Sequence, residues 1–128
     1  MTSVSRDIFD SCIKIHKALG PGLFEIVYKQ CLAYELQKLG HDVGLEVSLP
    51  VSYETLDFEN GYKADLLVNK KIIIELKSVD KLSAVHKAQL LTYLKLSNYP
   101  LGFLINFGET LVKDGFHRFA NGEEANGM

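Results

Sequence analysis

Three consecutive isoleucines, Ile72, Ile73 and Ile74, place the strongest constraint on the fold of this chain. Such a run predicts a β-strand that is buried on both faces, because every side chain must meet apolar neighbours. Residues 101–107, with the sequence LGFLINF, predict a second strand of the same kind, central in its sheet and parallel to a neighbour. The pattern is typical of an α/β domain with a mixed central sheet flanked by helices.

The hydrophobic periodicity of the rest of the chain predicts the order of the other elements. Apolar spacings of three and four residues indicate helices, and strict alternation indicates half-buried strands. The polar segment 55–61 predicts a turn. The expected helices cover residues 5–18, 21–40 and 83–96, and the expected strands cover residues 43–53, 61–68, 72–77, 101–107 and 116–119.

The length of the chain limits it to a single domain, because 128 residues with 47% hydrophobic content supply one core. We expect this domain to cover residues 1–119 and the polar tail 120–128 to be disordered. No apolar segment approaches the roughly 20 residues that cross a bilayer, and the polar N-terminus predicts no signal peptide. We therefore expect a cytoplasmic protein without a membrane partner. The net charge of −2 neither names nor excludes a nucleic-acid partner.

The loop between the strands 61–68 and 72–77 decides which charged side chains meet. A three-residue loop pairs Val68 with Ile72 and Leu66 with Ile74, which makes one face of the hairpin apolar. A two-residue loop would split the charged residues between the two faces, so we expect the three-residue loop at 69–71. The opposite face then collects four charged residues: Lys63, Asp65, Glu75 and Lys77.

Asp65 and Glu75 are predicted to lie directly across from each other, with their Cβ atoms about 5 Å apart. Two carboxylates this close repel unless a proton or a cation lies between them. Mg²⁺ is the expected occupant because it prefers oxygen ligands, Mn²⁺ can substitute, and the backbone carbonyl of Leu76 is an expected further ligand. Lys77 can assist an attacking water or stabilise charge on a phosphate. Alternatively, the charged face is a solvated set of ion pairs that contributes little.

The arrangement of Asp65 and Glu75-Leu76-Lys77 on a strand hairpin resembles the PD-(D/E)XK nuclease motif. Ala64 stands where the motif's name would put proline. Residues 22–28, GLFEIVY, resemble the signature of the GxxExxY proteins, a small branch of this superfamily. Further blocks follow in the same order, so that the resemblance extends from about residue 19 to residue 118.

The resemblance implies a restriction-endonuclease-like α-β-β-β-α-β core with a metal-dependent active site. In the superfamily, acidic residues bind Mg²⁺, the lysine assists the attacking water, and a carboxylate on the first core helix, matched by Glu25, often completes the site. A QxxxY element on the following helix is matched by Gln89 and Tyr93. We take Glu25 and Gln89 as catalytic candidates, and Tyr28, His86 and Tyr93 as candidate substrate contacts. From the residues alone, Glu25 could equally interact with the helix dipole, and His86, Gln89 and Tyr93 could form a plain polar stripe.

The function that the resemblance implies is a Mg²⁺-dependent nuclease that hydrolyses phosphodiester bonds of DNA or RNA with a metal-activated water. A catalytically silent module on the same fold, which binds nucleic acid or protein, is the alternative. Hydrolysis of a small phosphorylated metabolite stays open. Because the motif positions are intact, we expect the enzyme, and we expect it to act as a homodimer that presents two sites to two strands.

Overall fold

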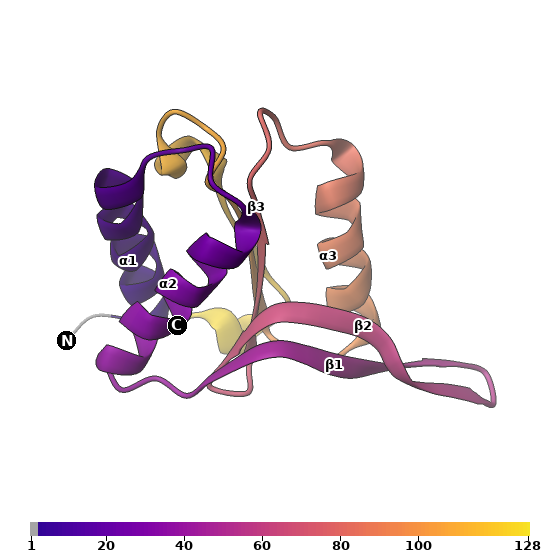
Figure 1. The fold of residues 1–128 in the computed structure, drawn as a ribbon. Helices are drawn as coiled ribbons and strands as arrows, with labels where there is room; N and C mark the ends of the chain where they lie inside the picture. Colours follow the sequence, from indigo (N-terminus) through magenta and orange to yellow (C-terminus); the bar gives the residue numbers. More distant parts are fainter. Residues whose placement is uncertain (1–2) are drawn as a thin grey trace.

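Residues 3–128, which the computed structural model describes, form three α-helices, five β-strands and two short 3-10 helices (Figure 1). The α-helices are α1 (Val4–Leu19), α2 (Glu25–Lys38) and α3 (Ala84–Leu96). The strands are β1 (Val43–Tyr53), β2 (Leu56–Val68), β3 (Ile72–Lys77), β4 (Leu101–Asn106) and β5 (Phe116–Ala120), and the 3-10 helices are η1 (Val112–Gly115) and η2 (Glu123–Ala125). Across this part of the chain, no helix combines the length and apolar character that a membrane span requires.

The five strands form one mixed sheet in the order β1-β2-β3-β4-β5. β3 and β4 run parallel, with α3 between them in sequence, and the other neighbouring strands are antiparallel. The isoleucine run lies in the middle of the sheet, where it pairs with the first half of β4. The predicted α/β fold with a mixed central sheet flanked by helices is confirmed.

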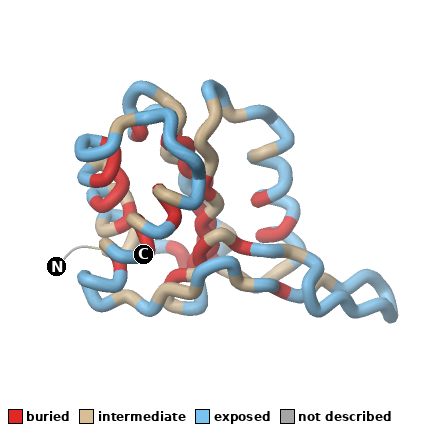
Figure 2. Tube along the Cα trace, in the orientation of Figure 1, coloured by how far each residue is buried: buried red, intermediate tan, exposed pale blue. Residues whose placement is uncertain are grey.

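The two faces of the sheet are covered by different helices (Figure 1). α1 and α2 pack on one face, where Leu66, Ile72 and Ile74 belong to a continuous apolar cluster. α3 packs on the other face, where Ile73 belongs to a smaller cluster with Leu90. Burying a side chain of this size stabilises the fold by about 1.5–3 kcal/mol. Figure 2 shows the buried residues concentrated in the sheet between the helices.

The hairpin between β2 and β3 has the predicted register. Val68 pairs with Ile72 and Leu66 pairs with Ile74, which leaves a three-residue loop at 69–71. Asn69 and Lys70 adopt the left-handed conformation, with φ values of 54° and 57°, which lets the chain reverse in so few residues. The three-residue loop is therefore confirmed.

The prediction of a turn at residues 55–61 is wrong for residues 56–61, which belong to β2, because the turn comprises only Glu54 and Thr55. β2 begins at Leu56, which pairs with Tyr53, so that β1 and β2 extend past α3 as a long hairpin, called the arm below (Figure 1). The arm comprises residues 50–61 and is largely exposed (Figure 2). Pro50 lies where the register between β1 and β2 shifts. The polar composition of this segment reflects exposure on both faces and not a turn.

The beginning of α2 and the end of the chain also differ from expectation. α2 begins at Glu25, later than predicted, because Gly22 has a φ of 99° and Phe24 is extended. The tail at residues 120–128 contains η2, and Ala125 is buried. Arg118 Nη2 donates a hydrogen bond of 2.9 Å to the Ala125 carbonyl. This packing differs from the expectation of a disordered tail.

Candidate active site

A cleft of about 660 Å³ lies between the β2–β3 hairpin and α3, and it brings together four of the five predicted catalytic residues. The four charged residues of the hairpin line one wall, and Gln89 lies on the opposite wall, which α3 provides. The lining residues are Gly61, Tyr62, Lys63, Asp65, Glu75, Lys77, Val85, Ala88, Gln89 and Thr92. The hairpin register and the packing of α3 on the sheet therefore create one polar cleft from segments far apart in sequence.

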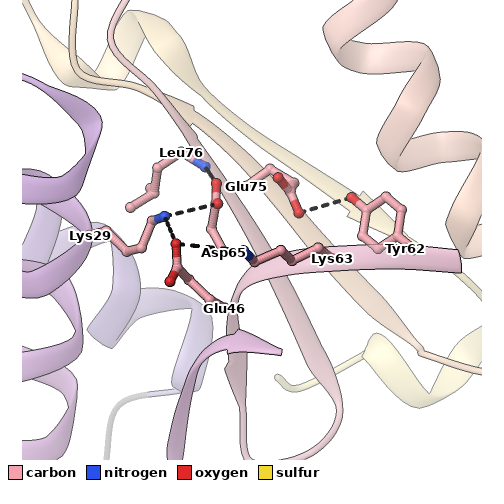
Figure 3. Close-up of polar contacts among 7 residues, drawn as sticks. All are labelled: Lys29, Glu46, Tyr62, Lys63, Asp65, Glu75 and Leu76. Carbon is pink, nitrogen blue, oxygen red and sulfur yellow. Dashed lines mark hydrogen bonds and ion pairs between the residues drawn. The ribbon is translucent and has the colours of Figure 1, made fainter. Parts of the chain in front are cut away.

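Asp65 lies where β2 leaves β3. The pairing of the two strands ends at Leu66 and Ile74, and Ala64 already packs with the α3 side of the core. Asp65 Oδ2 accepts a hydrogen bond of 2.8 Å from the Leu76 backbone N–H, in place of a strand carbonyl (Figure 3). The N–H and C=O of one strand residue point to the same side. The Leu76 carbonyl is therefore directed toward Asp65, as a shared metal site would require.

Glu75 is held by Tyr62, whose hydroxyl donates a hydrogen bond of 2.9 Å to Oε1 (Figure 3). Burial raises the pKa of Glu75 to about 8, and the negative charge of Asp65 adds to the rise. The pKa of Tyr62 is also raised, first by burial and then by Glu75, so that its hydroxyl stays a donor. Without a metal ion, the raised pKa of Glu75 favours its protonated form near neutral pH.

A lysine that the sequence analysis did not single out contacts Asp65 from the other side. Lys29 Nζ lies 3.3 Å from Asp65 Oδ1 and 3.3 Å from Glu46 Oε1 (Figure 3). Burial lowers the pKa of Lys29, but Asp65 and Glu46 raise it more, so that the pKa is raised and the ammonium stays charged. Glu46 has a φ of 50°, a left-handed conformation that is unfavourable for a residue with a side chain.

Three residues of this site, Lys29, Glu46 and Tyr62, were missed from the sequence. For Lys29 a signal exists, because Leu32, Ala33 and Leu36 follow it at helical spacings of three, four and seven and are all buried. Lys29 therefore shares the apolar face of α2. Glu46 and Tyr62 carry no comparable signal, since their roles depend on the bend of the sheet.

Tyr28 is a structural residue, which corrects its prediction as a substrate contact. Its ring is fully buried and stacks on Phe107 at a centroid distance of 4.4 Å. Its hydroxyl donates to the Gly20 carbonyl at 2.6 Å and accepts from the Leu23 N–H at 3.1 Å. Tyr28 thereby fixes the loop that precedes α2.

Tyr93 also does not line the cleft, and its prediction as a substrate contact is corrected. It is buried, it stacks on Tyr62 at 4.3 Å, and its hydroxyl donates to the Pro50 carbonyl at 3.1 Å. It therefore supports Tyr62 and the base of the arm. His86 lies outside the residues that line the cleft and closes the N-terminal capping box of α3, where its Nδ1 accepts from the Ser83 N–H at 3.0 Å.

Glu25 is the exposed first residue of α2 and does not line the cleft. It lies one helical turn before Lys29, on the same face of the helix. Ser78 Oγ donates a hydrogen bond of 2.6 Å to the Leu23 carbonyl, which ties the loop before α2 to the segment that follows β3. The catalytic role of Glu25 stays a prediction.

The oxygen atoms of the cleft suit a hard divalent ion. Within residues 3–128, no cluster of three or more His, Cys, Asp or Glu side chains could hold a metal by itself. Zn²⁺ sites need three or four such ligands, whereas Mg²⁺ is commonly bound by one or two carboxylates and keeps several waters. The carboxylates of Asp65 and Glu75 and the carbonyl of Leu76 fit Mg²⁺ or Mn²⁺.

The chain matches the model of one protein family. The model of the PD-(D/E)XK nuclease superfamily matches residues 2–119, which include every residue that lines the cleft. Neither a curated protein nor a solved structure matches the chain significantly. The narrower resemblance to the GxxExxY proteins stays a prediction. With a matching fold and a superfamily match over nearly its whole length, the chain belongs to the PD-(D/E)XK nuclease superfamily.

Proposed function

We propose that this protein is a metal-dependent nuclease that hydrolyses phosphodiester bonds of DNA or RNA, with the cleft between the β2–β3 hairpin and α3 as its active site. One observation carries the proposal: Asp65, Glu75 and Lys77, the three charged positions of the superfamily motif, line the same cleft. Nucleases of this superfamily typically use divalent metals, in agreement with the oxygen ligands that the cleft offers.

The residues of the cleft have separate tasks in this proposal. Asp65, Glu75 and the Leu76 carbonyl would hold the ion, which when bound supplies an activated water and neutralises charge on the phosphate. The Leu76 N–H orients Asp65, and the Tyr62 hydroxyl orients Glu75. These two hydrogen bonds hold the carboxylates in position before a substrate arrives.

Lys77 and Gln89 would contact the substrate phosphate. Lys77 lines the cleft and has no ion-pair partner within residues 3–128, so its ammonium is available for a phosphate oxygen or the attacking water. Gln89, from the opposite wall, offers an amide donor. Water attack in this arrangement needs no covalent intermediate.

The test is cleavage of four substrates by purified protein with Mn²⁺ and then Mg²⁺: supercoiled plasmid, single strands, branched DNA and structured RNA. Lys77→Ala should reduce the cleavage rate by about 10²- to 10⁴-fold, because a positioned catalytic group is lost, while metal binding persists. Lys95→Ala is the matched control, since Lys95 is exposed in the last turn of α3 and does not line the cleft. It should cleave as the wild type does.

Two results would contradict the nuclease. If the wild type and Lys77→Ala are equally inert on every substrate but bind one of them, the protein is a binding module. If Asp65→Asn leaves metal binding unchanged in calorimetric titration, Asp65 is not a ligand and the metal site is wrong.

We also propose that the protein acts as a two-fold homodimer. The arm supports this proposal, since it carries three exposed large apolar side chains, Tyr53, Leu56 and Phe58. Light scattering at high micromolar concentration should give twice the mass of the chain. A monomeric mass under these conditions would contradict it.

A further inference from the structure

Lys29 occupies an unusual place for a lysine. It is 8% exposed and lies on the face of α2 that packs against the sheet, beside the buried Leu32 and Ala33. Lysine is almost never buried unless it is paired. The burial of Lys29 therefore depends on the carboxylates that receive it.

Two carboxylates hold the Lys29 ammonium, Asp65 at 3.3 Å and Glu46 at 3.3 Å (Figure 3). The Lys29 side chain is 10% exposed, whereas the Lys14 side chain in the ion pair with Glu35 is 63% exposed. Solvent and salt screen a partly buried pair much less than an exposed one. The left-handed backbone of Glu46 is maintained where its carboxylate reaches this ammonium.

The contacts of Asp65 show what Lys29 does to the site. Oδ1 faces the Lys29 ammonium and Oδ2 faces the Leu76 N–H, so both oxygens already have a positive or partly positive partner. A divalent ion bound between Asp65 and Glu75 would lie close to this ammonium, and the two positive charges would repel. The ion and Lys29 thus compete for the same carboxylate.

We infer that Lys29 is a built-in cation that neutralises Asp65 in the metal-free protein, and that a divalent ion must displace it from Asp65 in order to bind. The inference rests on the metal site of the proposed function. Lys29 is a positioning residue in this scheme, because it acts on the metal through Asp65. The Lys29 ammonium lowers the affinity for metal, and it offsets the repulsion between the Asp65 and Glu75 carboxylates.

The size of the effect follows from the distance. A positive charge within about 4–6 Å lowers the pKa of a carboxylate by about 1–3 units. Such a charge lowers the affinity of the carboxylate for a metal ion in the same way. Lys29→Met removes the charge and keeps the length of the side chain, so it should tighten Mn²⁺ binding by about 10- to 1000-fold. Lys29→Arg keeps the charge and should bind Mn²⁺ nearly as the wild type does.

The experiment is calorimetric titration with Mn²⁺ alone, without nucleic acid, at one pH and ionic strength. Lys14→Met is the matched control, because Lys14 also forms an ion pair, with Glu35 at 2.9 Å, but its side chain is 63% exposed and it does not line the cleft. The control should change the affinity by less than about fivefold. Affinity in Lys29→Met equal to or weaker than that of the wild type would overturn the inference.

A second measurement uses the wild-type protein and does not depend on the folding of Lys29→Met. With lysine side chains labelled with ¹³C, the ε-carbon resonance of Lys29, assigned through Lys29→Arg, should shift during titration with Mg²⁺. The Lys14 resonance should stay constant. A Lys29 resonance that does not move while Mg²⁺ saturates the protein would overturn the inference.

The outcomes separate this inference from the proposed function. If the wild type binds Mn²⁺ and Lys29→Met binds it no more tightly, the role of Lys29 is wrong while the metal site stands. If no variant binds Mn²⁺, Lys29→Met included, the metal site fails and the inference fails with it.

Discussion

α1 and α2 cover one face of the sheet with a continuous apolar core, whereas α3 leaves room on the other face for a polar cleft. The difference arises within single strands, because Ile74 packs under α1 and α2 while its neighbour Ile73 packs under α3. The larger cluster contains most of the buried apolar side chains. The smaller one needs to hold only part of α3, so the remainder of that face can carry charged side chains.

The largest expected effect is a difference between these two adjacent isoleucines. Ile74→Ala and Ile73→Ala both remove a fully buried side chain, and each should lower the free energy of unfolding by about 2–5 kcal/mol. Ile74→Ala should cost more, because the larger cluster cannot collapse around the cavity, whereas α3 can shift toward the sheet. Urea unfolding of both variants measures the two costs. A larger loss for Ile73→Ala would contradict the comparison.

The two carboxylates of the cleft should respond in opposite ways, because they are tied to different faces. Asp65 is bound to α2 through Lys29, so Asp65→Asn removes a partner of a buried ammonium and should lower metal-free stability by about 1–3 kcal/mol. Glu75→Gln removes only the repulsion from Asp65, so it should raise stability at pH 8. Thermal melts in the presence of a chelator measure both effects. If both substitutions change the metal-free stability in the same direction, Lys29 does not neutralise Asp65.

The pH dependence of stability should come from the α3 face of the sheet, through the carboxyl group of Glu75. Burial and Asp65 raise the folded-state pKa of Glu75 from 4.5 to about 8, so between these values the folded protein holds a proton that the unfolded chain has released. Stability of the metal-free protein should therefore fall as pH rises through this interval, by a fraction of the about 1.4 kcal/mol per pH unit that one full proton would give. Denaturant titrations at several pH values measure the slope. Glu75→Gln should flatten it, and Glu59→Gln, on the exposed arm, should leave it unchanged.

The smallest expected effect compares the buried tyrosines of the two faces. The Tyr28 hydroxyl makes two hydrogen bonds with the loop before α2, whereas the Tyr93 hydroxyl donates one to Pro50. Since one such bond contributes about 0.5–1.5 kcal/mol, Tyr28→Phe should cost more than Tyr93→Phe by about that amount. Urea unfolding of the two variants gives the difference. Equal costs would show that the second hydrogen bond of Tyr28 contributes nothing.

The sequence predicted those features that depend on the pattern of buried side chains. The isoleucine run predicted the central strand, and the apolar faces of residues 64–68 and 72–76 predicted the loop at 69–71. The β2 half of the arm was missed, because a strand that extends beyond the core need not alternate between buried and exposed residues. Residues 55–61 therefore resemble a turn in sequence although residues 56–61 form the first part of β2.

The charged site was predictable only in part. Asp65, Glu75 and Lys77 follow from the hairpin, since its register places them on one wall of the cleft. Lys29 and Glu46 lie far from the hairpin in sequence. Lys29 reaches Asp65 only because α2 packs across the sheet, and Glu46, with its left-handed backbone, reaches Lys29 from β1. Tyr28 was misassigned because its place in the motif suggested contact with substrate, whereas its spacing of four from Leu32 already indicated the core.

β1 is the outermost strand of the sheet, and a long free edge usually offers its unpaired N–H and C=O groups to strands of other chains. Here the edge is interrupted twice, by the left-handed backbone at Glu46 and by the register shift at Pro50, which also has no N–H to donate. A foreign strand could therefore pair with only a few residues at a time before it met an irregularity. The outer edge of β1 can therefore be exposed and still resist the addition of a foreign strand.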